Sequence, residues 1–150
     1  MNDAASSPST PASALRVLLL DDDAFMLDLL ADMLAGLGLN NVHAETDARR
    51  ALALIAADAP ALLICDLSMP DMDGIEFMQA AAAAGYRGQV MLLSGMDAGV
   101  RLAAETLASA QGLQVLGAFR KPISAHDMAA ALAPLIGAAA DGKQGARRAG

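Results

Sequence analysis

The chain has 150 residues, one cysteine, a net charge of −7 and a hydrophobic content of 55% that is rich in alanine. Its length suits one domain with one core, and its acidic balance, with one Tyr, three Phe and no Trp, argues against nucleic-acid binding. No apolar stretch is long enough to cross a bilayer and the lone cysteine excludes an internal disulfide, so we expect a cytoplasmic protein that binds neither membrane nor nucleic acid.

The two ends of the chain differ in composition from its middle. Residues 1–13 are rich in Ser, Pro and Ala without apolar periodicity, which is typical of a disordered leader. Residues 137–150 are rich in Gly and Ala with a basic end, which favours a flexible tail. We therefore expect one folded domain at 14–136.

Between these ends, short apolar runs alternate with amphipathic stretches. Buried strands are predicted at 15–20, 42–45, 62–66, 90–93 and 115–119. Helices are predicted from Met26 to about Gly36 and at 47–58, 75–84, 97–111 and 124–136. Five strand–helix units in succession predict an α/β fold, a five-stranded doubly wound parallel sheet with five helices on its two faces.

The most informative motif follows the third predicted strand, where Asp66 ends the apolar run Leu62-Leu63-Ile64-Cys65. A turn punctuated by Pro70 and Gly74 comes next. A carboxylate at the end of a buried strand is costly to desolvate, so it is normally held there by a cation, by hydrogen bonds or by chemistry.

Polar groups follow three other predicted strands. They are the acidic run Asp21-Asp22-Asp23, then Ser94, and then Lys121, which is the only lysine between residues 1 and 142. Because the carboxyl ends of parallel strands lie along one edge of a sheet, we expect these groups to form a single site with Asp66.

The acidic run has two explanations, because acids are also favoured at helix starts by the helix dipole. With Asp66 nearby, a hard divalent cation such as Mg²⁺ becomes the better account of Asp21 and Asp22, while Asp23 suits a helix cap. Asp71 and Asp73 suit the tight turn after Asp66 and the start of the next helix. The remaining groups that could bind metals, His43, His126 and Cys65, are not assigned to the site.

An acid pair, an acceptor Asp, a hydroxyl and a Lys in this order resemble the receiver domain of two-component response regulators. The resemblance implies the flavodoxin-like receiver fold. It also implies that Asp66 accepts a phosphoryl group from a histidine kinase or a histidine phosphotransfer protein. The signal would pass by contact to a downstream protein of unknown identity, or the phosphoryl group would be shuttled on. Catalysis would be limited to self-phosphorylation and self-dephosphorylation.

The same resemblance implies roles for the residues around Asp66. Mg²⁺ would be held directly by Asp22, largely through water by Asp21, and also by Asp66 and the main-chain carbonyl of Ser68. Ser94 and Lys121 would contact the phosphoryl group, with Lys121 aimed into the site by a cis bond to Pro122. Ser68 and Met96 would border the path of the hydrolytic water.

The sequence departs from the family at two places. Receivers commonly place an aromatic residue three positions before the Lys, and here that residue is Ala118, followed by Phe119. Because the side chains of a strand alternate between faces, Phe119 should point to the opposite face from position 118. The segment from Ser94 to Lys121 is also longer than usual by roughly one helical turn. In this it resembles receivers attached to cyclic-di-GMP phosphodiesterase domains, although we expect a stand-alone receiver.

Two other functions remain as alternatives. Asp21, Asp23, Ser94 and Lys121 also resemble haloacid-dehalogenase-type phosphatases, whose nucleophile would be Asp21. Phe25 stands where those enzymes usually carry Thr or Val, and Asp66 with its loop would have no role. A pseudo-receiver that binds a partner without phosphorylation is the third possibility, although all four chemical positions are filled.

Overall fold

The computed structural model describes residues 14–68, 74–95 and 97–149, with side chains as far as Gly137. The strands are β2 (Arg16–Leu20), β3 (Asn41–Glu45), β4 (Leu62–Asp66), β5 (Gln89–Ser94) and β6 (Gln114–Arg120). The helices are α1 (Ala24–Gly36), α2 (Ala48–Ala57), α3 (Gly74–Ala83), α4 (Ala98–Ala110) and α5 (Ala125–Ala149). None of the described helices has the length and apolar character needed to cross a membrane.

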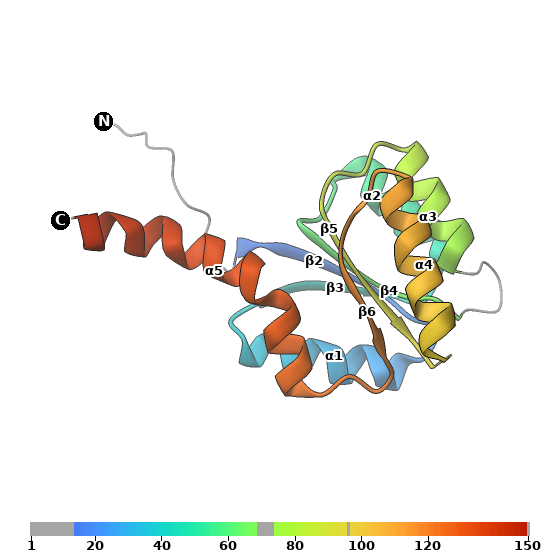
Figure 1. Cartoon of the computed structure of the whole chain (residues 1–150), viewed down its shortest axis with the longest axis horizontal. Helices are drawn as coiled ribbons and strands as arrows, with labels where there is room; N and C mark the ends of the chain where they lie inside the picture. The colour runs from blue at the N-terminus through green and yellow to red at the C-terminus, as the bar shows by residue number, and fades with distance from the viewer. Residues whose placement is uncertain (1–13, 69–73, 96, 150) are drawn as a thin grey trace.

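The strands form one sheet in the order β3-β2-β4-β5-β6, and every neighbouring pair is parallel. Helices α1 and α5 cover one face, whereas α2, α3 and α4 cover the other (Figure 1). The predicted doubly wound α/β architecture is therefore confirmed. Its strand order brings the ends of β2, β4 and β5 next to one another at the centre of the sheet.

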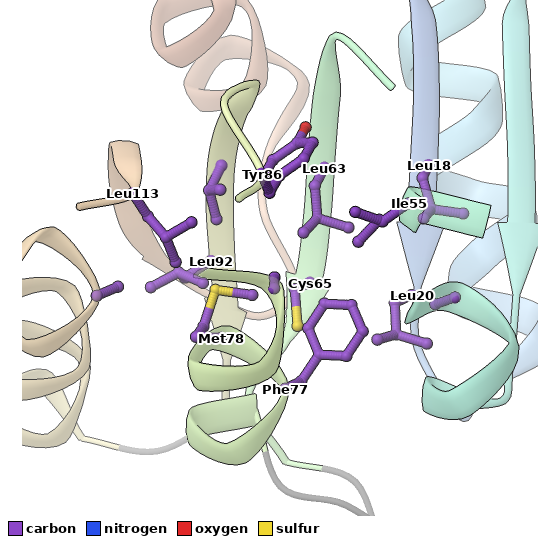
Figure 2. Packing of buried hydrophobic residues seen from close by; sticks show 14 of the residues in the cluster. Leu18, Leu20, Ile55, Leu63, Cys65, Phe77, Met78, Tyr86, Leu92 and Leu113 are labelled. Atoms are coloured by element: carbon purple, nitrogen blue, oxygen red, sulfur yellow. The ribbon is translucent and has the colours of Figure 1, made fainter. Parts of the chain in front are cut away.

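The sheet divides the core into two clusters because side chains alternate along each strand. On central strand β4, which is buried throughout, Leu63 and Cys65 face α2–α4, whereas Leu62 and Ile64 face α1 and α5. Figure 2 shows the first cluster, in which the fully buried ring of Phe77 lies beside Cys65. Burial on both faces explains why β4 is a continuous apolar run rather than an alternating one.

The chain's single tyrosine closes the amino end of the sheet. Tyr86 is buried, and its hydroxyl donates a hydrogen bond to the carbonyl of Pro60 at 3.0 Å. Pro60 precedes β4 and Tyr86 precedes β5, so this contact lies at the opposite edge from the strand ends that carry the polar groups.

Among the described residues, aspartates cap helices α1, α2 and α4. Asp23, Asp47 and Asp97 accept hydrogen bonds from main-chain N–H groups in the first turns of α1, α2 and α4. At the start of α5, the Ser124 hydroxyl accepts one from the N–H of Asp127 at 3.0 Å. The predicted capping role of Asp23 is thus confirmed.

Helix α5 is longer than the sequence predicts. We expected it to end at Ile136, and it continues to Ala149. Alanine is the best helix former, and the alanine-rich composition of residues 137–149 is compatible with continued helix despite its glycines. The division of the chain into a leader, a domain and a flexible tail stays a prediction, and the leader at 1–13 lies outside the described residues.

Candidate functional site

The four polar groups predicted at strand ends meet at one edge of the sheet. Asp21 follows β2, Asp66 ends β4, Ser94 ends β5 and Lys121 follows β6. Among the described residues, the buried polar or charged ones are Asp21, Asp66 and Ser94, each at most 2% exposed. The buried polar and charged side chains of the described residues therefore all lie at this one site.

Lys121 joins the two buried carboxylates. Its Nζ lies 2.9 Å from Oδ2 of Asp21 and 3.3 Å from Oδ2 of Asp66. Its main-chain N–H donates to the carbonyl of Ser94 at 2.9 Å, which fixes the end of β6 beside that of β5. The Lys121–Pro122 peptide bond is cis, as the resemblance implied.

The second oxygen of each carboxylate accepts a hydrogen bond from the main chain. Oδ1 of Asp21 accepts from the N–H of Asp23 at 2.9 Å, and Oδ1 of Asp66 accepts from the N–H of Ser68 at 3.0 Å. Each carboxylate therefore presents one oxygen to its own loop and the other to Lys121. This arrangement fixes both side chains and partly offsets the cost of their burial.

The protonation of the site follows from these contacts. Burial raises the pKa of the Asp66 carboxyl, and the charge of Asp21 adds to this rise. The Ser68 N–H and Lys121 oppose it without cancelling it. Burial by itself would lower the pKa of Lys121, but the hydrogen bond to Asp21 and the charges of Asp66 and Asp21 outweigh it and raise that pKa. Lys121 therefore stays cationic at neutral pH.

The acidic groups could hold a metal ion. Carboxylate oxygens of Asp21, Asp22 and Asp66 all lie within 4.8 Å of one another. Two of these residues are buried and Asp22 is exposed, so a cation here would be bound by the protein on one side and open to water on the other. An all-oxygen, partly hydrated site suits a hard divalent cation such as Mg²⁺. Participation of the Ser68 carbonyl stays a prediction.

Several residues discussed from the sequence do not join the site or cannot be placed. His43 is exposed on edge strand β3, and His126 is exposed at the start of α5. Cys65 is buried, and desolvation strongly raises the pKa of its thiol, as expected for a packing residue. Residues 69–73, with Asp71 and Asp73, and Met96 lie outside the described residues.

The sequence did not predict the close approach at Gly74, the first residue of α3. A Cβ added there would lie 2.5 Å from Cα of Leu67 and 3.1 Å from the carbonyl oxygen of Asp66. Only glycine lets α3 start against the loop that carries Asp66. The signal was present in the sequence, because this glycine ends the turn that follows the acceptor strand.

Strand β6 contains an irregularity that the sequence did not predict. Val90 and Met91 of β5 are consecutive, but they pair with Val115 and Gly117, so Leu116 is an extra residue. Ala118 then faces the α2–α4 cluster, whereas Phe119 packs against the α1–α5 cluster. The prediction that Phe119 points away from the face of position 118 is confirmed.

This irregularity is a β-bulge with Leu116 as the extra residue, and it requires glycine at position 117. Gly117 has φ 153°, and an added Cβ would lie 2.9 Å from the Phe119 ring. We expect Gly117→Ala to lower the free energy of unfolding by about 2 kcal/mol, measured by urea denaturation followed by circular dichroism. In a Phe119→Leu background the loss should shrink. An equal loss in both backgrounds would assign the whole effect to the backbone and none to the ring.

Comparison with known proteins identifies the family. A model of the response regulator receiver domain matches residues 17–133 of the chain. The chain belongs to this family. Receivers of this family are signalling modules, and the fold described above is that of a CheY-like receiver.

Curated and solved relatives agree with this assignment. The receiver is 30% identical over 119 residues to the cyclic di-GMP phosphodiesterase RocR of Pseudomonas aeruginosa, covering 79% of this chain but 30% of RocR. It is 28% identical over 127 residues to a chemotaxis protein CheY of Rhizobium etli, covering 85% of this chain and 96% of that protein. The crystal structure of a response regulator from Colwellia psychrerythraea has a TM-score of 0.70 and 37% identity, covering 82% of this chain and 97% of that one.

Proposed function

We propose that Asp66 accepts a phosphoryl group from a phosphohistidine on a histidine kinase or a histidine phosphotransfer protein. The observation that carries this proposal is the buried Asp66 carboxylate, held between the Ser68 N–H and the Lys121 ammonium beside two further carboxylates. Family membership supports it. Neither the phosphatase nor the pseudo-receiver alternative gains support from the relatives.

In the proposed reaction, a carboxylate oxygen of Asp66 attacks phosphorus. An O–P bond forms, the N–P bond of phosphohistidine breaks, and the electron pair leaves with the imidazole. Because Asp66 is fixed by the Ser68 N–H, positioning contributes much of the rate. Lys121 offers a compact positive charge to the phosphoryl oxygens, and the buried hydroxyl of Ser94 ends the strand next to Asp66.

Mg²⁺ is the cation that we propose for the acidic cluster, where it would offset negative charge on the phosphoryl oxygens. Asp21, Asp22 and Asp66 would hold it, together with the main-chain carbonyl of Ser68. The buried pair of carboxylates supplies more negative charge than the single ammonium of Lys121 neutralises, which favours a further cation.

The phosphorylated receiver would signal by contact with a downstream protein or pass the phosphoryl group on, and water would finally hydrolyse it. We assign no catalysis beyond these steps on Asp66. We place the receiver, with its domain at 14–136, in the cytoplasm, because its single cysteine fits a reducing compartment.

The test is phosphorylation by acetyl phosphate with Mg²⁺, followed by intact mass and acid lability. The native protein should gain one acid-labile phosphoryl group, Asp66→Asn should gain none, and EDTA should block the gain in the native protein. No gain in the native protein would refute the proposal. A label that persists in Asp66→Asn and disappears in Asp21→Asn would instead support the phosphatase chemistry.

A further inference from the structure

The two outer strands of the sheet differ in how they are protected against pairing with a further strand. At one side, β6 is interrupted by its bulge and ends in exposed Arg120. At the other side, β3 pairs with β2 in continuous register over Asn41–Glu45 and contains no proline, lysine or arginine. Natural edge strands usually carry such residues or a bulge, because an unprotected edge is a template for another chain. Strand β3 therefore has the properties of a strand that pairs with another chain.

The hydrogen-bonding groups on the outer side of β3 belong to Val42 and Ala44. The carbonyl of Glu45 accepts a hydrogen bond from the N–H of Asp21 at 3.2 Å, so the main-chain groups of Glu45 point toward β2. Because the main-chain groups of successive strand residues alternate in direction, those of Val42 and Ala44 point away from β2. Two N–H groups and two carbonyls are therefore available to a new strand.

A second copy of β3 satisfies all four groups when it lies antiparallel and the pairing is centred on His43. In that register Val42 faces Ala44 of the second copy, Ala44 faces its Val42, and each pair exchanges two hydrogen bonds. His43 faces its own counterpart across a two-fold axis, in a pair without hydrogen bonds. Opposite residues share a face of the sheet, so both copies of α2 lie on the same face. Strand β3 is thus complementary to itself.

Helix α2 leaves room for this pairing and supplies complementary charges. A hollow of about 390 Å³ beside β3 is lined by His43, Glu45, Arg50, Ala53, Leu54 and Ala57. Arg50 stands near the start of α2 and Asp58 follows its end, with side chains 71% and 80% exposed and no charged residue between them. The two-fold axis makes the two α2 helices antiparallel, which brings Asp58 of each copy toward Arg50 of the other.

We infer that the receiver forms a symmetric dimer in which β3 pairs antiparallel with β3 of a second copy, so that two sheets become one continuous sheet. The new junction runs along the outer side of β3, whereas Asp66 ends central strand β4. Dimerisation therefore does not require phosphorylation, and Asp66 stays accessible to a donor in both copies.

Sedimentation velocity of the full chain, from low micromolar to several hundred micromolar concentration, tests the dimer. The mass of the native protein should rise from 15.2 kDa toward twice that value. Ala44→Lys adds a charge at an exposed position of the pairing edge and should raise the dimer dissociation constant at least about tenfold. Leu102→Lys is the matched control, because Leu102 is an exposed apolar residue on α4, and it should leave the constant unchanged.

Disulfide cross-linking tests the register. In His43→Cys two thiols meet across the axis at a Cα separation of about 4.5 Å, which a disulfide can span. Oxidation should therefore join two chains covalently. Asn41→Cys faces Glu45 of the second copy and should not be joined under the same conditions. Native Cys65 does not compete, because it is buried and its burial raises the pKa of the thiol.

Three results would overturn the inference. The first is a native protein that stays at 15.2 kDa throughout the concentration range. The second is a dimer that persists in Ala44→Lys or is lost in Leu102→Lys, because the interface would then lie elsewhere. The third is equal cross-linking of His43→Cys and Asn41→Cys, which would indicate random collision rather than one fixed register.

Discussion

Lys121→Ala is expected to lower the free energy of unfolding by about 3 kcal/mol in metal-free buffer at neutral pH. Lys121 lies within 3.3 Å of carboxylate oxygens of both Asp21 and Asp66, and each of these residues is at most 2% exposed. Without the ammonium, two buried negative charges would face each other uncompensated. Urea denaturation followed by circular dichroism, with EDTA present, measures the loss.

The loss in the free energy of unfolding of Lys121→Ala should be larger at neutral pH than in acid. Burial already raises the pKa of Asp66 above its ordinary value of 3.8, and removing Lys121 takes away one of the opposing contributions. A carboxyl group whose pKa is raised by folding stabilises the folded state at pH values below its ordinary pKa. This stabilisation is lost as the pH rises through the pKa of the folded state. The difference between Lys121→Ala and native protein should therefore be largest at neutral pH and shrink toward pH 4.

Two further measurements complete this experiment. Mg²⁺ should restore part of the lost stability, because a cation bound only by the folded state stabilises it by mass action. Arg120→Ala, which removes an exposed positive charge from the preceding position, should change stability by less than about 0.5 kcal/mol. A loss that is equal at both pH values and insensitive to Mg²⁺ would mean that Lys121 acts through packing rather than charge.

Gly74→Ala is expected to be nearly as damaging, with a loss of about 2–3 kcal/mol in the free energy of unfolding. The new Cβ would lie 2.5 Å from Cα of Leu67, so either α3 or the loop after β4 must move. The better helix propensity of alanine offsets only about 1 kcal/mol of this cost. Because Asp66 adjoins that loop, phosphorylation by acetyl phosphate should also slow.

Gly36→Ala provides the matched control for Gly74→Ala. Gly36 is also a helical glycine, at the end of α1, but an added Cβ there would meet nothing within 4 Å. The control should be at least as stable as the native protein and should be phosphorylated at the native rate. If Gly74→Ala matched this control in both measurements, the contact with Leu67 would have no energetic consequence.

Most of the fold could be predicted because local signals agree with the overall architecture. Strand β4 was predicted to the residue, since Leu62–Asp66 is bounded by a proline-containing turn and by the acidic loop. The bounds of α2 and α4 were predicted to within one residue of the observed helices, because Asp47 and Asp97 are strong caps.

The site could be predicted from one rule of parallel sheets, namely that the carboxyl ends of strands share an edge. Two further features depend on contacts that no local pattern encodes. The bulge at Gly117 depends on how β6 pairs with β5, and the need for glycine at position 74 depends on the approach of α3 to Leu67. The length of α5 was also missed, because the Gly- and Ala-rich composition of residues 137–150 suggested a flexible tail.

The position of Tyr86 has a practical consequence for spectroscopy. The receiver has no tryptophan, and its single tyrosine is buried at the amino end of the sheet, across the molecule from the carboxylates. Intrinsic ultraviolet fluorescence should therefore report global unfolding and remain nearly blind to cations or phosphate at Asp66. A tryptophan placed at exposed Ser68 would add an optical probe beside the reactive carboxylate, against a background with no competing indole signal.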